Sequence, residues 1–126
     1  MLKHAQSRLA ELAEPHYAAL GVTGRQVALL TLFADGPPLS QQDGAAQLGI
    51  DRTTMVALVD ELEEQGLVRR EVAPGDRRKR LVTEQGERVL REGARVTEEV
   101  EDRFLEPLAA DDARRLREAL HLLVER

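Results

Sequence analysis

The helical spacing of apolar residues is interrupted once along the chain, between residues 66 and 84. This interruption limits the folds that the chain can adopt. Before Gly66, apolar residues recur every three or four positions, as on one face of an α-helix. Two short runs rich in β-branched residues, 67–72 and 80–83, then flank the turn signal Pro74-Gly75-Asp76. After residue 84 the helical spacing returns. The chain is therefore expected to be mainly α with a small β-hairpin.

Capping residues and glycines divide the first part of the chain into four expected helices. The pair Thr23 and Gln26 has the spacing of a reciprocal capping box, and Asp51 is a good N-cap for the helix that follows it. Pro15 is expected to kink or restart the first helix, and Gly49 to end the short third one. The expected helices cover residues 2–20, 24–34, 40–48 and 52–65.

The part that follows the hairpin is predicted to form a long helix and a shorter one. Apolar residues keep helical spacing from Val89 to Leu105, which gives a helix roughly 30 Å long at about 1.5 Å per residue. Such a helix is too long for a compact small domain. The stripes Leu2-Leu9-Leu12 and Leu116-Leu120-Leu123 have no obvious core of their own chain to cover them. We therefore expect a homodimer whose two-fold interface uses these stripes.

Charge is distributed unevenly along the chain, which matters more here than the net charge of −5. Residues 69–80 carry six basic and two acidic side chains, which gives a local charge of +4. Residues 84–126 carry eight basic and twelve acidic side chains, which gives a local charge of −4. There is no cysteine, which excludes disulfides and thiolate metal sites, and no apolar run approaches the roughly 18–20 residues of a membrane span. We expect a cytoplasmic protein without a membrane partner.

The order of the predicted elements is that of a winged helix-turn-helix: a short helix, a glycine turn, a second helix with a polar start and a basic hairpin. Arg52, Thr53 and Thr54 lie on the first turn of the second helix, where side chains reach base edges in the major groove of DNA. Cations at the tip of the wing follow phosphates or enter the minor groove, and Arg77, Arg78 and Lys79 are expected at that tip, on a mobile turn. The pattern predicts a protein that binds double-stranded DNA.

The sequence resembles the MarR (multiple antibiotic resistance regulator) family over essentially its whole length. The resemblance rests on Leu39-Ser40-Gln41, Leu48-Gly49-Ile50-Asp51-Arg52-Thr53-Thr54, Gly66-Leu67-Val68, Asp76-Arg77-Arg78 and Thr83-Glu84-Gln85-Gly86. It implies a winged helix-turn-helix lobe at 22–83, N- and C-terminal dimerisation helices at 1–21 and 84–126, and repression relieved by a small ligand, often phenolic. The DNA contacts expected on this basis are Ser40, Gln41, Arg52, Thr53, Thr54, Arg77, Arg78 and Lys79.

Three features depart from the family pattern. Val56 and Ala57 stand where relatives usually carry polar or basic groove-facing residues, so base reading is expected to include apolar contact with thymine methyl groups. Gly44 replaces a usual core leucine, which predicts lost packing and a loosely held third helix. The chain between Asp76 and Thr83 is two residues short, which predicts a shorter wing.

Other candidate sites are weaker. His16, Tyr17 and Arg25 fall near the expected junction of the dimerisation helices and the lobe, where relatives keep their effector pocket. An aromatic ring and a cation there suit a small aromatic or phenolic anion, but the same residues also suit ordinary packing. The histidines lack metal-ligand spacing, and no nucleophile, phosphate loop or carboxylate pair indicates an enzyme, so no metal, no cofactor and no catalysis are expected. The acidic run Glu98–Asp102 is interpreted as a solvated face.

A second function class remains open from the sequence. The acidic balance of the chain and the apolar Val56 and Ala57 also fit a winged helix that has lost DNA binding and that contacts another protein. A gel shift with DNA from its own promoter region would separate the two functions.

Overall fold

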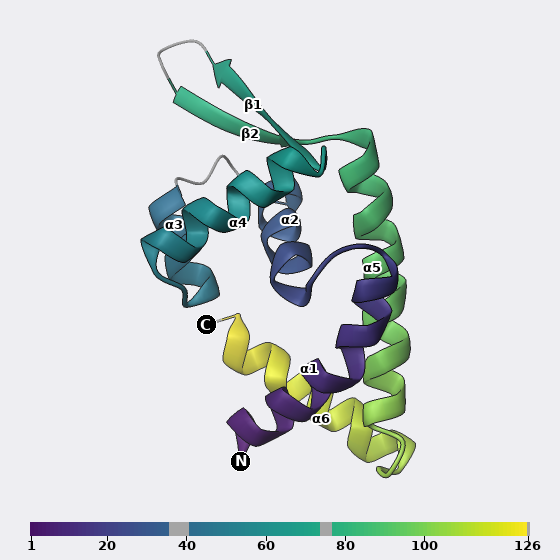
Figure 1. The fold of residues 1–126 in the computed structure, drawn as a ribbon. Helices are drawn as coiled ribbons and strands as arrows, with labels where there is room; N and C mark the ends of the chain where they lie inside the picture. The colour runs from purple at the N-terminus through teal and green to yellow at the C-terminus, as the bar shows by residue number, and fades with distance from the viewer. Residues whose placement is uncertain (36–40, 74–76, 126) are drawn as a thin grey trace.

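The structure, a computed structural model, describes residues 1–35, 41–73 and 77–125, and it has the predicted fold class. Figure 1 shows α2, α3 and α4 grouped beneath a two-stranded hairpin, with the long α5 along one side and α1 and α6 toward the end of α5 that lies away from the hairpin. The elements are α1 (Leu2–Ala19), α2 (Gly24–Asp35), α3 (Gln41–Leu48), α4 (Arg52–Glu64), β1 (Val68–Ala73), β2 (Arg77–Val82), α5 (Glu84–Phe104) and α6 (Ala110–Val124).

The predicted helix boundaries follow from local hydrogen bonds. The Thr23 N–H donates to Gln26 Oε1 (3.0 Å) and the Gln26 N–H donates to Thr23 Oγ1 (3.2 Å), so the predicted capping box is present at the start of α2. The chain reverses after α3 at Gly49, whose φ of 67° is one that residues with a Cβ seldom adopt. Pro15 lies inside α1, which continues to Ala19 without a restart.

The hairpin is longer than the sequence pattern predicted. Its two strands pair antiparallel, from Val68 opposite Val82 at the base to Ala73 opposite Arg77 at the far end. Arg77, Arg78 and Lys79 therefore belong to strand β2, and the expectation that they lie on a mobile turn is wrong. Cross-strand pairing extends β2 through residues whose own β propensity is low, because the partner strand supplies the hydrogen bonds.

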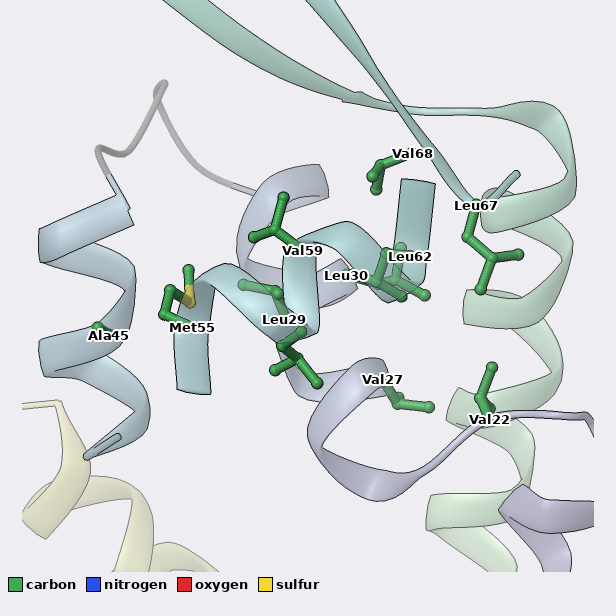
Figure 2. Close-up of a cluster of buried hydrophobic side chains, with 11 residues drawn as sticks. Val22, Val27, Leu29, Leu30, Ala45, Met55, Val59, Leu62, Leu67 and Val68 are labelled. Atoms are coloured by element: carbon green, nitrogen blue, oxygen red, sulfur yellow. The ribbon is translucent and has the colours of Figure 1, made fainter. Parts of the chain in front are cut away.

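The core of the lobe lies between α2, α4 and the base of the hairpin (Figure 2). The apolar residues predicted for the inner face of the fourth helix, Met55, Leu58, Val59 and Leu62, are all buried. They contact the fully buried Leu29 and Leu30 of α2, as well as Leu67 and Val68 at the start of the hairpin. The core is aliphatic, so it holds α4 by close packing rather than by large aromatic surfaces.

Gly44 does not leave the gap that its position suggests. It is buried in α3, and a Cβ built on it would lie only 2.8 Å from Cε of Met55. The flexible thioether of Met55 thus occupies the space of the missing side chain, as methionine often does in irregular cores. The prediction of lost packing around Gly44 is wrong for this reason.

A second, smaller core joins α1 to α5. It consists of Ala13, Val96 and Val100, with Leu9, Tyr17 and Leu20 packed against it. Tyr17 and Leu20 also contact the core of the lobe, so they connect the two clusters. This small cluster is what attaches the N-terminal helix to the long α5.

Helix α6 is held to the rest of the chain by ion pairs. None of its residues is buried. Arg117 reaches back to α5, where Nη1 lies 3.0 Å from Glu101 Oε2 and Nη2 lies 2.9 Å from Asp102 Oδ1. Glu98, Glu99 and Asp102 are exposed, as expected for a solvated face, and Glu101 is half-buried; the ion pairs of Glu101 and Asp102 with Arg117 are a contact that the sequence did not predict.

Length and apolar composition limit which of the described helices could cross a membrane. No single helix among them is long and apolar enough to cross a membrane. Helices α1 and α2 have the length and apolar composition of a span only when taken together, and this pair is bent by 80° at its break.

Candidate DNA-binding interface

Helix α4 has one buried face and one exposed face, and the exposed face begins with the residues predicted to read bases. Arg52 and Thr53 are exposed on the first turn, as are Val56, Ala57 and Asp60 on the next turns. The opposite side of the helix is locked into the core of the lobe. The helix can therefore present its polar start to a partner without losing its own packing.

Thr54 differs from its two neighbours. It is half-buried, and its N–H donates to Oδ1 of the N-cap residue Asp51 at 2.7 Å. Hydrogen bonds from the backbone and the side chain of Thr54 hold the pKa of Asp51 below its usual value, with a smaller contribution from the Arg25 cation. Thr54 thus serves the helix start, and the exposed predicted contacts on this turn are Arg52 and Thr53.

The far end of α4 is fixed by a polar network that the sequence did not predict. Gln26 is only 3% exposed, and its Nε2 donates to Glu61 Oε2 (3.3 Å) and to Gln65 Oε1 (3.3 Å). Gln65 Nε2 in turn donates to the Gly21 carbonyl (3.4 Å). A buried amide with all its groups bonded is a strong constraint, because breaking one bond leaves a desolvated polar atom. The network sets the position of α4 relative to α1 and α2.

The wing is anchored to α4 at its base. Arg70 of β1 lies beside Glu63 of α4, with Nε 3.6 Å from Oε1. Arg77, Arg78 and Lys79 follow one another along β2, in pairing positions opposite Ala73, Val72 and Glu71. The hairpin therefore brings a row of cationic residues out from the helix that carries Arg52. Ser40 and the turn Pro74-Gly75-Asp76 lie outside the described residues, and of Gln41 the structure gives only its place as the first residue of α3.

Thr83 joins the wing, α4 and α5 at one point. Its hydroxyl donates to the Gly66 carbonyl (2.6 Å) and accepts the Gly86 N–H (3.1 Å), while its own N–H donates to the Leu67 carbonyl (3.0 Å). Gly86 packs directly on that Leu67 carbonyl, since a Cβ built on it would lie 2.2 Å from the oxygen. In the sequence, Thr83 and Gly86 were noted as part of a family motif. The structure gives the physical reason for the glycine, because there is no room for a side chain at Gly86, where β2 meets α5.

The three residues predicted for an effector site are not brought together around a described cavity. Tyr17 is half-buried, and its hydroxyl is hydrogen-bonded to Thr97 Oγ1, which itself donates to the Gly93 carbonyl (2.8 Å). Tyr17 is thus the donor in its own bond. His16 and Arg25 are exposed. The effector site stays a prediction.

Two open grooves lie elsewhere, at the end of α5 away from the wing. One has a volume of about 530 Å³ and lies between α5 and α6, with Leu105, Ala113 and Arg117 in its lining. The other has a volume of about 890 Å³ and lies between the start of α1 and the end of α5, with His4, Leu12 and Phe104 in its lining. Among the residues that the structure describes, no cluster of three or more His, Cys, Asp or Glu side chains could hold a metal ion.

Comparison with known proteins is consistent with this geometry. The sequence profile of the MarR family matches residues 20–79, which include α2, α3, α4 and most of the hairpin. The transcriptional regulator HosA of Escherichia coli O111:H- is 28% identical over 109 residues, covering 85% of this chain and 73% of that protein. A Thauera aromatica protein assigned to the transcriptional regulation of the hcr operon is 41% identical over 59 residues, which span 47% of this chain but only 36% of that protein.

A solved structure extends the likeness to nearly the whole chain. CouR from Rhodococcus jostii RHA1, solved with p-coumaroyl-CoA bound, superposes with a TM-score of 0.79 at 26% identity, covering 97% of this chain and 87% of that one. The family match falls on the lobe that carries the exposed face of α4 and the basic hairpin, and the structural likeness adds the helices around it. By sequence and by fold, the chain is similar to the MarR family of transcriptional regulators.

Proposed function

We propose that this protein is a ligand-responsive repressor that binds pseudo-palindromic operators as a homodimer in the cytoplasm. The observation that carries the proposal is the pairing of the exposed start of α4 with a hairpin that carries consecutive cations on β2. In a winged helix-turn-helix, the second helix of the motif enters the major groove, and two copies read half-sites about one helical turn apart. The net charge of −5 does not oppose this, because the cations that would meet phosphates are gathered on the wing.

The base-reading half of the proposal is tested by Arg52→Ala. A guanidinium on the first turn of α4 can donate two hydrogen bonds to one guanine, so its loss should cost roughly 1–3 kcal/mol and relax preference at one base position. Gel shifts with the promoter DNA and with single-base variants of it would measure both effects. Arg88→Ala, an exposed cation on α5, is the control and should leave base preference unchanged. If Arg52→Ala bound every variant as the unmodified protein does, α4 would not be the reading helix.

The homodimer follows from apolar side chains that this chain alone leaves uncovered. Leu116 and Leu120 of α6 are 38% and 39% exposed, and Leu123 is 59% exposed. Leu2 and Leu12 of α1 are 72% and 37% exposed. Most of both predicted stripes is therefore available to a second copy, and Leu9 is the member that packs within its own chain.

A charge placed in this stripe should separate the protomers. Leu120→Glu should shift the protein from dimer to monomer in light scattering at micromolar concentration, since a carboxylate buried in an apolar interface lacks a partner. Val56→Glu is a matched control, because Val56 is also 39% exposed but lies on α4. The control should remain a dimer. A monomeric unmodified protein under the same conditions would contradict the proposal.

The proposed effector is a small aromatic or phenolic anion; the p-coumaroyl-CoA bound to CouR shares the phenol ring of this class but is a much larger CoA thioester. A ligand can relieve repression only if it binds more tightly to the arrangement of recognition helices that does not fit DNA. Tyr17 is well placed for such coupling because it contacts both hydrophobic cores.

Calorimetry with a panel of aromatic carboxylates tests the predicted site. Arg25→Ala removes a charged hydrogen-bond donor from the predicted site, so it should weaken ligand binding roughly tenfold. Arg8→Ala tests the alternative that the ligand binds in the groove at the start of α1, because Arg8 helps to line that groove. Unchanged affinity in Arg25→Ala together with a loss in Arg8→Ala would move the site to that groove.

One observation favours the second function class, a protein-interaction module. The exposed face of α4 carries an apolar residue, Val56, and two carboxylates, Asp60 and Glu64. These groups suit a protein surface better than a phosphate backbone. A gel shift with no DNA retained at low salt would favour this function.

A further inference from the structure

The exposed face of α4 is built from two rows of residues with different side-chain sizes. Residues four positions apart form ridges along a helix. Arg52, Val56 and Asp60 form one such ridge, and all three are exposed. Thr53 and Ala57 form the adjacent row and are exposed as well, but their side chains are short. The first ridge therefore projects beyond the second, and it would reach the floor of a groove first.

The three members of this ridge differ in chemistry. Arg52 offers several N–H donors, Val56 offers only methyl groups, and Asp60 offers only acceptors when ionised. Val56 is 39% exposed, so its methyl groups are available to a partner.

Asp60 also differs from its acidic neighbours on α4. Glu61 accepts a hydrogen bond from Gln26, and Glu63 lies beside Arg70, so both are engaged within the lobe. Within the described part of the chain, the side-chain carboxylate of Asp60 makes no hydrogen bond or ion pair. Its carboxylate is repelled by phosphates and can be accommodated in a DNA groove only opposite a donor.

We infer, on the basis of the proposed DNA binding, that this ridge reads three chemically different base edges in one half-site. Each residue type has one matching edge in the major groove: Arg52 pairs with O6 and N7 of a guanine, Val56 contacts the C5-methyl of a thymine, and Asp60 accepts from N4 of a cytosine. Val56 and Asp60 are thereby specificity-determining residues of the site.

The spacing of the ridge fixes the spacing of the bases. Four residues advance an α-helix by about 6 Å, and base pairs are stacked about 3.4 Å apart. For a helix that follows the groove, the three contacts therefore lie about two base pairs from one another. The expected half-site has guanine, thymine and cytosine edges in this order over about five base pairs.

The thymine contact is tested on the DNA side. The full chain is first used to select its preferred duplex from a randomised library, and the selected thymine is then replaced by uracil, which removes only the methyl group. Loss of one buried methyl-sized contact should weaken binding of the unmodified protein about fourfold, and Val56→Ala should be insensitive to the same replacement. Uracil at a thymine outside the half-site is the control and should have no effect.

The cytosine contact is tested on the protein side. An amide in place of the carboxylate favours adenine, whose N6 and N7 it can meet together. Asp60→Asn should therefore change the selected base from cytosine to adenine at one position. Glu64→Gln is the matched control, because it removes one exposed carboxylate from the last residue of α4, and it should leave the selected bases unchanged.

The outcomes separate this inference from the proposed function. If no sequence is enriched and no duplex is retained, DNA binding itself fails. If a sequence is enriched but binding is insensitive to uracil at every thymine, or Asp60→Asn tightens binding to all duplexes alike, the protein reads DNA and the ridge assignment is overturned.

Discussion

Replacing Gly86 by alanine is expected to destabilise the protein severely, although helix propensity alone predicts the opposite. Alanine is favoured over glycine inside a helix by about 1 kcal/mol. At this position, however, the new Cβ would lie 2.2 Å from the backbone oxygen of Leu67 and 2.7 Å from Cγ1 of Val82. A backbone carbonyl cannot rotate away as a flexible side chain can, so the start of α5 would have to move. Overpacking of this kind costs about 1–3 kcal/mol and sometimes more.

Because the contact is with a backbone oxygen, we expect a cost at the upper end of this range, about 3 kcal/mol, which after the helix-propensity gain of about 1 kcal/mol leaves a net loss of about 2 kcal/mol in the free energy of unfolding for Gly86→Ala. For a chain of this size, thermal unfolding at fixed protein concentration should then begin roughly 5–10 °C lower. Gly93→Ala is the matched control on the same helix, because the nearest atom to its Cβ would be Cγ1 of Val27, at 3.3 Å. A side chain can yield there, so the change in stability should be small. Equal midpoints for the two variants would show that the joint at Thr83 is not tightly packed.

The elements whose signals are local could be predicted from the sequence. The capping box of Thr23 and Gln26, the Asp51 N-cap and the turn at Gly49 each depend on residues within four positions of one another. The four inner residues of α4 follow from helical spacing alone. These signals were sufficient to identify the fold class and the exposed start of the recognition helix.

What the sequence could not show depends on contacts between distant segments. Gln26 was recognised as a capping residue, but its bonds to Glu61 and Gln65 join positions 35 and 39 residues away. The pairing that carries β2 back to Arg77 depends on the partner strand, and the role of Met55 beside Gly44 depends on how two helices cross. No periodicity within one segment contains this information.

The DNA affinity of the wing should depend strongly on salt. In the structure the wing residues Arg77 and Arg78 lie on the paired strand β2, in positions opposite Ala73 and Val72. Each phosphate contact contributes about 0.9 to the slope of log K against log salt concentration. Replacing both arginines by alanine should therefore lower the slope by up to about 2 units for each wing, or about 4 for the dimer. Between 50 and 200 mM salt, the unmodified protein should lose roughly 100-fold more affinity than the variant.

The matched control for this prediction removes the same charge from another place. Arg91→Ala with Arg95→Ala deletes two exposed cations of α5, and because the wing stays intact the slope should stay close to that of the unmodified protein. Binding to specific and random duplexes should weaken alike in the wing variant, since phosphates carry no sequence information. If the two double variants had the same slope, net charge rather than the wing would govern affinity. If neither variant changed the slope, the wing would not touch DNA, and the protein-interaction function would become the better explanation of the exposed face of α4.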